Sequence, residues 1–424
     1  MSEVENKTGA VEDITANLST WKQALAGSQM LFVAFGALVL MPLITGLDPN
    51  VALFSAGIGT LIFHIVTKGK VPIFLASSFA FIAPIAYGIQ TWGVAGTMSG
   101  LFAAGLVYVA MSAAVKVCGV GFIERLLPPV VVGPVIMVIG LGLATMAVNM
   151  ALGKTGDGSA VFIPQNEAMI ISISALLTTL LVSTMAKGVF KLVPIFAGVL
   201  VGYLLSLYFN VINFAPISAA PWFSIPKFVA PELNWYAIMF MIPVAIAPAV
   251  EHVGDILAIS NVTGKDYLKK PGLHCTLLGD GLATSASALF GGPPNTTYSE
   301  VTGAVMLTKN FNPKIMRWAA IFAIVLAFVG KFGVVLQTIP VAVMGGIMIL
   351  LFGSIASVGL STLIRHQVDL SEARNLCIVS VTLVFGIGGM AFGIGEFSLQ
   401  GVSLCGIVAI VLNLVLPKTR TTAA

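Results

Sequence analysis

The chain has 424 residues, of which 58% are hydrophobic and only 9% are charged. Soluble domains carry roughly a quarter charged residues, so this composition excludes a soluble globular protein and indicates a polytopic membrane protein. The formal net charge of +4 comes from Lys and Arg side chains scattered at the ends of apolar runs, which excludes a nucleic-acid-binding face.

The first 20 residues are polar and acidic and lack the apolar core of a signal peptide, so they are expected to form a cytoplasmic tail. Twelve segments after the tail are apolar and long enough to cross about 30 Å of hydrocarbon. They are 24–44, 50–67, 95–117, 128–150, 167–186, 190–208, 236–260, 274–291, 315–336, 340–358, 375–392 and 399–416. Two more, 71–88 and 294–308, are broken by Pro, Gly, Ser and Thr and are predicted to be interrupted spans.

The basic residues support fourteen crossings with both termini in the cytoplasm. On that count, Lys154 and Lys227 fall in outer loops and Lys331 lies near an outer end, which leaves 18 of the 21 Lys and Arg on the inner side. Omitting either interrupted span would invert every later segment and remove the positive-inside bias. We therefore expect all fourteen segments to cross.

The two halves of the chain resemble each other. The run from Ser77 to Phe81 matches the run from Thr296 to Glu300, and the apolar run that starts at Pro129 matches the one that starts at Pro340. Because each half holds an odd number of spans, seven, the halves should insert in opposite orientations, as in secondary transporters built from inverted repeats. Chance similarity among common apolar residues is the alternative.

Two acidic residues in apolar stretches, Glu251 and Glu300, are the leading candidates for function. A carboxylate inside a bilayer is costly unless it faces a cavity, a partner or a proton, so it usually marks a transport site. Glu251 and Asp255 are four residues apart and share one helix face, where both will not readily ionise, so one is expected to carry a proton. A solvated structural position at a helix end is the alternative for these two residues, and a helix cap is the alternative for Glu300.

Other polar and aromatic residues have weaker signals. Asp280 is predicted to be a proton or network partner, with an inter-helix hydrogen bond as an equal alternative. His252 and His64 are expected to pack or to bond to backbone. Phe79 could stack on a planar ligand, although most aromatic side chains in such a chain face lipid or core.

Several classes of function have no motif in this chain. We find no phosphate-binding Gly loop, no nucleophile elbow and no His or Cys spacing for a metal. The sequence thus predicts neither an enzyme nor a cofactor site, and it disfavours ATP-driven transport. The four cysteines, Cys118, Cys275, Cys377 and Cys405, are expected to be free thiols.

Four motifs together resemble the uracil permeases of the nucleobase-ascorbate transporter family, also called nucleobase:cation symporter-2. They are Phe35 to Ala37, Ser77 to Phe81, Glu251 to Gly254 and Asn295 to Glu300. The resemblance runs from about Gln29 to Pro417. It implies short antiparallel strands in spans 3 and 10, a homodimer in the lipid membrane, and elevator-like movement of a core domain against a gate domain.

The resemblance also implies domain boundaries. The core would comprise 21–118 (spans 1 to 4) and 236–338 (spans 8 to 11), and the gate 119–235 (spans 5 to 7) and 339–417 (spans 12 to 14), with tails at 1–20 and 418–424.

By position, the resemblance assigns roles to individual residues. Glu251 and Glu300 would accept hydrogen bonds from the ring N–H groups of uracil, and Phe79 would stack on the ring. Ala37, Tyr298 and Ser299 would line the pocket and meet the carbonyls. Apart from the resemblance, Glu251, Asp255 and Asp280 are the residues that we expect to couple protons, because they are acidic and lie in apolar spans.

Three positions depart from the pattern of uracil permeases. Asp255 stands where they often have His and where purine-type relatives carry Asp, whereas Glu300 is typical of the pyrimidine type, since purine-type members tend to have Gln. Val301 replaces the usual Asn, and Phe352 replaces a Tyr seen in some members.

The sequence thus predicts an all-α membrane protein that imports uracil with protons across the bacterial inner membrane. A purine-type symporter for xanthine or urate is the nearest alternative. An anion exchanger or channel with the same fourteen-span plan is a remoter alternative. Such a protein should lack acidic residues at the membrane midplane, whereas this chain has Glu251 and Glu300 there.

Overall fold

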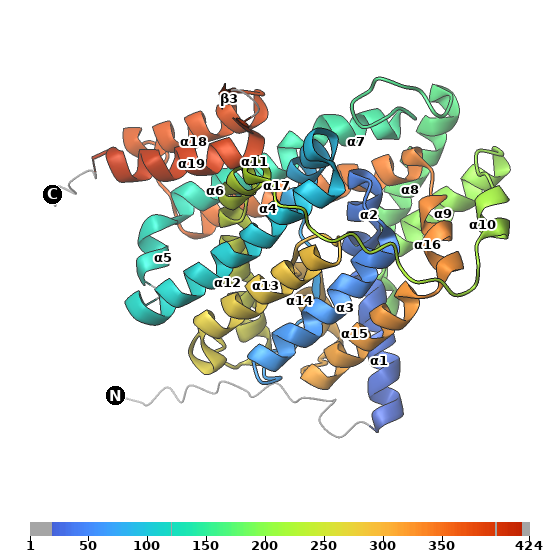
Figure 1. Cartoon of the computed structure of the whole chain (residues 1–424), viewed down its shortest axis with the longest axis horizontal. Coiled ribbons are helices and arrows are strands. Elements are labelled where there is room, and N and C mark those ends of the chain that lie inside the picture. Colours follow the sequence, from blue (N-terminus) through green and yellow to red (C-terminus); the bar gives the residue numbers. More distant parts are fainter. Residues whose placement is uncertain (1–18, 120, 395–396, 418–424) are drawn as a thin grey trace.

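The computed structural model describes residues 19–119, 121–394 and 397–417, and it is largely helical (Figure 1). The elements of the first half are α1 (Thr20–Val33), α2 (Phe35–Thr45), α3 (Pro49–Val66), β1 (Leu75–Ser77), η1 (Phe79–Phe81), α4 (Ile82–Cys118), α5 (Gly121–Leu126), α6 (Pro129–Gly142), α7 (Ala144–Ala151), α8 (Gln165–Met185), η2 (Gly188–Leu192), α9 (Pro194–Tyr208) and α10 (Ala215–Ala219). The elements of the second half are α11 (Trp235–Val244), α12 (Ile246–Thr263), η3 (Leu268–Gly272), α13 (Leu273–Leu289), β2 (Asn295–Thr297), α14 (Ser299–Thr308), α15 (Pro313–Ala327), α16 (Gly330–Gln337), α17 (Val341–Arg365), α18 (Ala373–Ile387), β3 (Ala391–Ile394), β4 (Phe397–Gln400) and α19 (Gly401–Val415).

Each of the fourteen predicted segments overlaps at least one of these helices. Within the described residues, six continuous helical stretches are long and apolar enough to cross a membrane, and the bent pair α1 and α2 would make a seventh. One of the six, Phe79–Cys118, is divided at Gly93, whose φ of 69° and ψ of 177° are not helical. This break lies between the predicted segments 71–88 and 95–117. The positions of the apolar segments are therefore as predicted, while the number that cross remains a prediction.

Both halves of the chain begin with a broken helix. α1 and α2 are separated at Ala34 and bend by 41°, and α11 and α12 are separated at Ala245. The two breaks lie 211 residues apart (245 minus 34), and the starts of α6 and α17 lie 212 residues apart (341 minus 129). These nearly equal separations are what a repeated half predicts.

The two interrupted spans pair with each other. β1 and β2 form a two-stranded antiparallel sheet in which Leu75 faces Thr297 and Ser77 faces Asn295. The short strands expected in spans 3 and 10 are therefore confirmed. A second hairpin, β3 with β4, joins the last two apolar helices and was not expected from the sequence.

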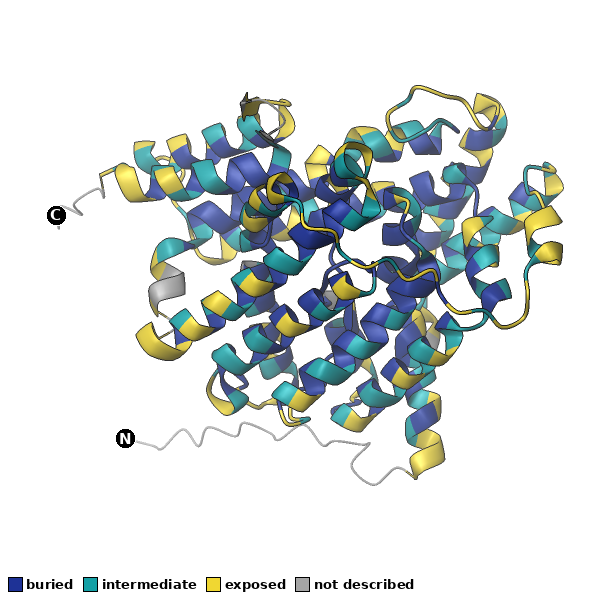
Figure 2. Cartoon of the chain, viewed as in Figure 1, coloured by how far each residue is buried: buried dark blue, intermediate teal, exposed yellow. Residues whose placement is uncertain are grey.

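The helices pack in two sets. In the first set, α4 packs on α13 and α11, α3 packs on α13 and α15, and α1 packs on α15. In the second set, α17 packs on α6, α7 and α8, α8 packs on α9, and α18 and α19 pack on each other and on α6. Buried residues concentrate on the helix faces that point into each set (Figure 2). The two sets follow the predicted core and gate segments, although that division remains a prediction.

A close approach of two helices holds the first set together. A Cβ atom added to Gly105 of α4 would lie 2.7 Å from the carbonyl oxygen of Gly281 in α13 and would overlap the hydroxyl of Ser285. Small residues at such crossings let helix backbones approach closely, which supplies the dispersion contacts on which helix packing in lipid depends. Asp280 lies on α13, next to Gly281, so the packing of α13 on α4 helps to position Asp280 beside the strand pair.

Candidate functional site

The polar centre of the molecule lies where the strand pair meets three helices. β2 packs against α12 and α13, and α12 packs against α14. The strands end where helices begin, since η1 starts at Phe79 after β1 and α14 starts at Ser299 after β2. The first N–H groups of a helix have no partner within the helix, so these starts direct free donors and positive partial charge toward the ends of the strands.

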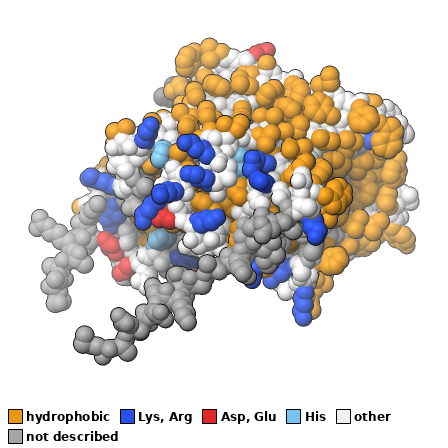
Figure 3. Space-filling model, turned by 90° about the horizontal axis from the view of Figure 1, so that it is seen from below, with side chains coloured by type: hydrophobic (Ala, Val, Ile, Leu, Met, Phe, Trp, Pro, Cys, Tyr) orange, Lys and Arg blue, Asp and Glu red, His pale blue; other side chains and the backbone are white. Residues whose placement is uncertain are grey.

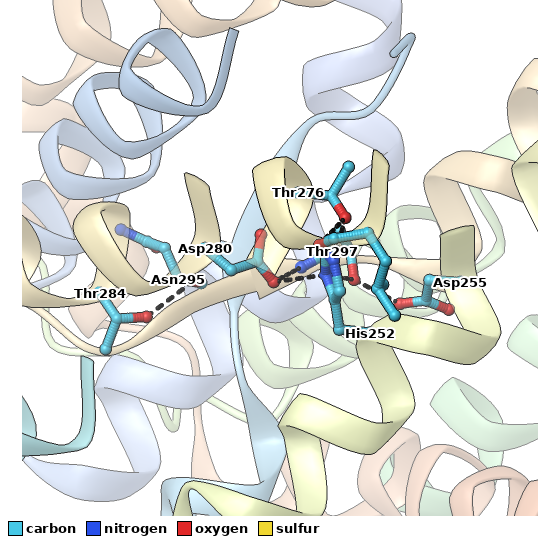
Figure 4. Close-up of polar contacts among 8 residues, drawn as sticks. His252, Asp255, Thr276, Asp280, Thr284, Asn295 and Thr297 are labelled. Atoms are coloured by element: carbon cyan, nitrogen blue, oxygen red, sulfur yellow. Dashed lines mark hydrogen bonds and ion pairs between the residues drawn. The ribbon is translucent and has the colours of Figure 1, made fainter. Parts of the chain in front are cut away.

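A buried hydrogen-bond network lies beside β2 (Figure 4). The Nδ1 atom of His252 on α12 is 2.8 Å from Oδ2 of Asp280 on α13, and both side chains are fully buried. The backbone N–H of Thr297 also donates to Oδ2 of Asp280 at 3.2 Å. The hydroxyl of Thr297 donates to Oδ2 of Asp255 at 2.8 Å, so a single strand residue contacts all three side chains.

Both ring nitrogens of His252 have hydrogen-bond partners. Thr276 donates its hydroxyl proton to the carbonyl of Leu273 at 3.0 Å, so its oxygen accepts from Nε2 of His252 at 2.9 Å. The second nitrogen, Nδ1, faces the carboxyl group of Asp280. Both ring nitrogens of His252 are therefore engaged in hydrogen bonds within the buried network.

The prediction that His252 packs or bonds to backbone is wrong. The rotation of about 100° per residue turns His252 away from Glu251, as expected, but toward α13 and β2, where Asp280, Thr276 and Thr297 lie. The sequence could not indicate this because these partners come from other elements. The same prediction for His64 is confirmed, since its Nε2 lies 3.0 Å from the carbonyl oxygen of Ile73.

Glu251 and Glu300 differ from the network in their access to solvent. Glu300 is exposed and Glu251 is half-buried, whereas Asp255 is only 5% exposed and Asp280 is fully buried. The neighbouring charges with the largest effect on Glu251 are those of Asp255 and Glu300, so the three acids form one electrostatic cluster. Glu300 lies in the first turn of α14, where the helix dipole favours a negative charge.

The aromatic candidates lie at the ends of the two strands. Phe79 follows β1 and Tyr298 follows β2, and their ring centroids are 6.4 Å apart with an interplanar angle of 61°. Both rings are at least nine-tenths buried, and the Tyr298 hydroxyl lies close to the Glu300 carboxyl and to the backbone of Ala37. Ala37 is fully buried in α2. The backbone of Ser299 begins α14, but its side chain lies outside the described residues.

The candidate residues predicted from the sequence therefore lie close together in one region, although they come from several elements. Glu251 and Asp255 come from α12, Asp280 from α13, Tyr298 and Glu300 from the start of α14, and Phe79 from the start of η1. Among the described residues, no three His, Cys, Asp or Glu side chains are arranged to hold a metal ion. The arrangement offers solvent-reaching carboxylates and two buried rings beside a buried network of hydrogen bonds.

The chain matches a family of known permeases over most of its length. A family model described as "Permease family", named for xanthine and uracil permeases, matches residues 21–395. A protein of Pasteurella multocida named "Probable uracil permease" is 63% identical over 95% of each chain. The protein of Bacillus caldolyticus named "Uracil permease" is 45% identical over 92% of this chain and 90% of its own, and that of Escherichia coli K12 is 39% identical over 91% and 89%.

Solved structures with little sequence similarity share the fold. The transmembrane domain of the cyanobacterial bicarbonate transporter BicA aligns with a TM-score of 0.64 at 13% identity, covering 92% of this chain and 96% of that one. The murine solute carrier 26 family member A9, an anion transporter in the inward-facing state, aligns with a TM-score of 0.70 at 11% identity, covering 94% of this chain and 68% of that one.

Proposed function

Because the chain belongs to this permease family, and is thus an integral multi-pass membrane transporter rather than an enzyme, we propose that it imports uracil together with protons. Its relatives in Pasteurella, Bacillus and Escherichia carry uracil permease in their names and align with it over nearly their whole length. Uracil is a planar neutral ring with two N–H donors and two carbonyl acceptors.

One observation supports this function above the others. Two glutamates that retain solvent access, Glu251 and Glu300, belong to the same cluster as a pair of buried aromatic rings and the start of a helix. The glutamates would accept the ring N–H groups, and Phe79 would stack on the ring face. The N–H groups at the starts of η1 and α14 would donate to the carbonyls, with Tyr298, Ser299 and Ala37 lining the pocket.

Proton coupling follows from the charge balance of the cluster. The cluster and the adjoining network hold four carboxyl groups, Glu251, Asp255, Asp280 and Glu300, but only one histidine, His252, which pairs with Asp280. Carrying the remaining carboxylates past an apolar surface would cost about 3 kcal/mol each. A proton taken up by Glu251 or Asp255 would remove one of those charges. Thr297 of β2 bonds to both Asp255 and Asp280, so a change in the charge of Asp255 would reach Asp280 and the strand pair through Thr297.

The movement that carries the site would be elevator-like. The site elements contact the first packing set, since η1 contacts α4, α12 contacts α13, and α14 contacts α1. The second set would supply the facing surface through α6 and α19, which contact α12. In this proposal, 21–118 and 236–338 form the core and 119–235 and 339–417 form the gate, with fourteen spans in two inverted repeats. The protein would be a homodimer in the cytoplasmic membrane, with both termini in the cytoplasm.

A purine-type carrier for xanthine or urate is the second candidate because of one residue. Asp255 is the residue that purine-type relatives carry at this position, and its bond from Thr297 ties it to β2. Glu300 favours uracil instead, since the purine type tends to have Gln there. The likeness to bicarbonate and anion transporters lies below 15% identity and concerns the fold alone.

Uptake of labelled uracil into proteoliposomes under an imposed inward proton gradient tests the proposal. We expect gradient-dependent uptake that excess unlabelled xanthine leaves unchanged and that returns uracil chemically unaltered. Uptake that persists after the gradient collapses would remove the proton from the mechanism, and strong competition by xanthine would establish the purine-type carrier.

A further inference from the structure

A cavity lined by lysines opens where α3 ends and where α13 and α15 begin. Its volume is about 580 Å³, and its charged lining consists of Lys70, Lys265, Asp266, Lys269 and Lys270. All five are exposed, so their charged groups reach the solvent. In the view from below, Lys and Arg side chains gather on this face of the molecule beside a broad apolar surface (Figure 3).

The lining has a strong excess of positive charge. Four lysines and one aspartate leave a formal charge of +3. Asp266 is engaged with Lys269, since its Oδ2 atom lies 3.3 Å from the ammonium group and its Oδ1 atom accepts the Lys269 backbone N–H at 3.2 Å. The other three lysines have no acidic side chain in the lining to neutralise them.

A further cation stands behind the cavity wall. Arg317 of α15 packs beside Gly69, which lines the cavity, and a Cβ atom on Gly69 would lie 3.7 Å from the guanidinium group. The Nε atom of Arg317 is buried and has no hydrogen-bond partner among the described residues. A buried donor without a partner is costly, and the guanidinium group adds a positive charge next to the lysines.

Membrane topology alone does not explain why these lysines share one cavity. The positive-inside bias asks only that Lys and Arg lie in inner loops, not that they share a cavity. Here Lys70 comes from the end of α3 and the other three come from the connection between α12 and α13, far along the chain. The packing of α3 on α13 and α15 brings the two segments together around this cavity.

We propose that this cavity binds a phosphate group. Several flexible ammonium groups around an open space suit a tetrahedral anion, which lysine binds as a point charge. The volume exceeds that of a single phosphate and leaves room for an ester substituent. The ester is either the headgroup of an anionic lipid of the inner leaflet or a soluble phosphate ester. The lining residues follow α3, precede α13 or begin α15, which are helices of the first packing set, so that set would carry the bound group.

Binding measurements on the purified full chain in neutral detergent test this site. The lipid probe is dioctanoylphosphatidylglycerol, with dioctanoylphosphatidylcholine as its uncharged counterpart, and the soluble probe is glycerol 3-phosphate. The test variants are Lys269→Gln with Lys270→Gln on one wall and Lys70→Gln on the other. The matched control is Lys187→Gln with Lys191→Gln, which removes two exposed lysines that do not line the cavity.

We expect at least one charged probe to bind in a salt-sensitive manner and the phosphatidylcholine not to bind. The double variant in the cavity should weaken that binding roughly thirtyfold and Lys70→Gln about fivefold, whereas the control pair should change it less than twofold. Binding of the phosphatidylglycerol alone assigns the site to lipid, and binding of glycerol 3-phosphate assigns it to a soluble ester. Absence of binding by both probes, or equal weakening in the control pair, would overturn the proposal.

Discussion

The substitution Asp280→Asn tests the buried network most directly. Asn preserves the shape of the side chain but removes the carboxylate that lies 2.8 Å from Nδ1 of His252 and accepts the N–H of Thr297. Removing one partner of a buried charged pair typically costs about 3 to 5 kcal/mol, because the other charge is left without compensation. If the pair consists of two neutral groups, the loss is nearer to the 1 kcal/mol of an ordinary hydrogen bond.

The expected change in melting temperature follows from the size of the chain. An unfolding entropy of about 2.1 cal/mol/K per residue gives roughly 0.9 kcal/mol per degree for 424 residues. Thermal unfolding in detergent, followed by fluorescence, should therefore show Asp280→Asn melting about 3 to 6 °C lower. Asp369→Asn, on an exposed loop, is the control and should shift the melting temperature by less than about 1 °C.

A double variant separates pairing from a general loss of packing. Since His252→Gln removes the partner that Asp280→Asn leaves uncompensated, the two together should melt no lower than Asp280→Asn alone. A melting temperature of Asp280→Asn within about 1 °C of the unmodified chain would refute the charged pair. Additive losses in the double variant would refute the coupling.

Three further changes have defined outcomes. Glu251→Gln should lower the initial rate of gradient-driven uracil uptake about tenfold to a hundredfold, because it removes a charge-assisted acceptor, and a rate within about threefold of the unmodified carrier would contradict this role. Glu300→Gln should weaken uracil uptake and make it more sensitive to xanthine, measured as the competitor concentration that halves uptake; unchanged sensitivity would separate Glu300 from substrate choice. Gly105→Ala should lower the melting temperature by about 1 to 3 °C through overpacking against α13, whereas Gly353→Ala, which meets nothing within 4 Å, should not lower it.

The sequence was sufficient for features that depend on neighbouring residues. Apolar length determines whether a segment can cross a membrane. Helices lie in all fourteen predicted segments, and β1 and β2 lie in the two broken ones, while the number that cross stays a prediction. A carboxylate in an apolar run is costly wherever the run lies, which identified Glu251 and Glu300 without any knowledge of their neighbours. The motifs around these residues also placed the chain in its family.

Contacts between distant segments required the tertiary structure. The register that pairs Ser77 with Asn295 and the role of His252 depend on elements brought together from both halves, and neither leaves a local pattern in the sequence. The hairpin of β3 and β4 was missed because its residues lie at the ends of two apolar helices.

The lysines of the cavity also show which features the sequence determines and which need the tertiary structure. The sequence by itself determined that they lie at the ends of apolar segments, because a charged side chain is expelled from hydrocarbon. Only the packing of α3 against α13 and α15 decided that Lys70 and Lys265 share one cavity, because the spacing of residues along a chain does not define their distance in space.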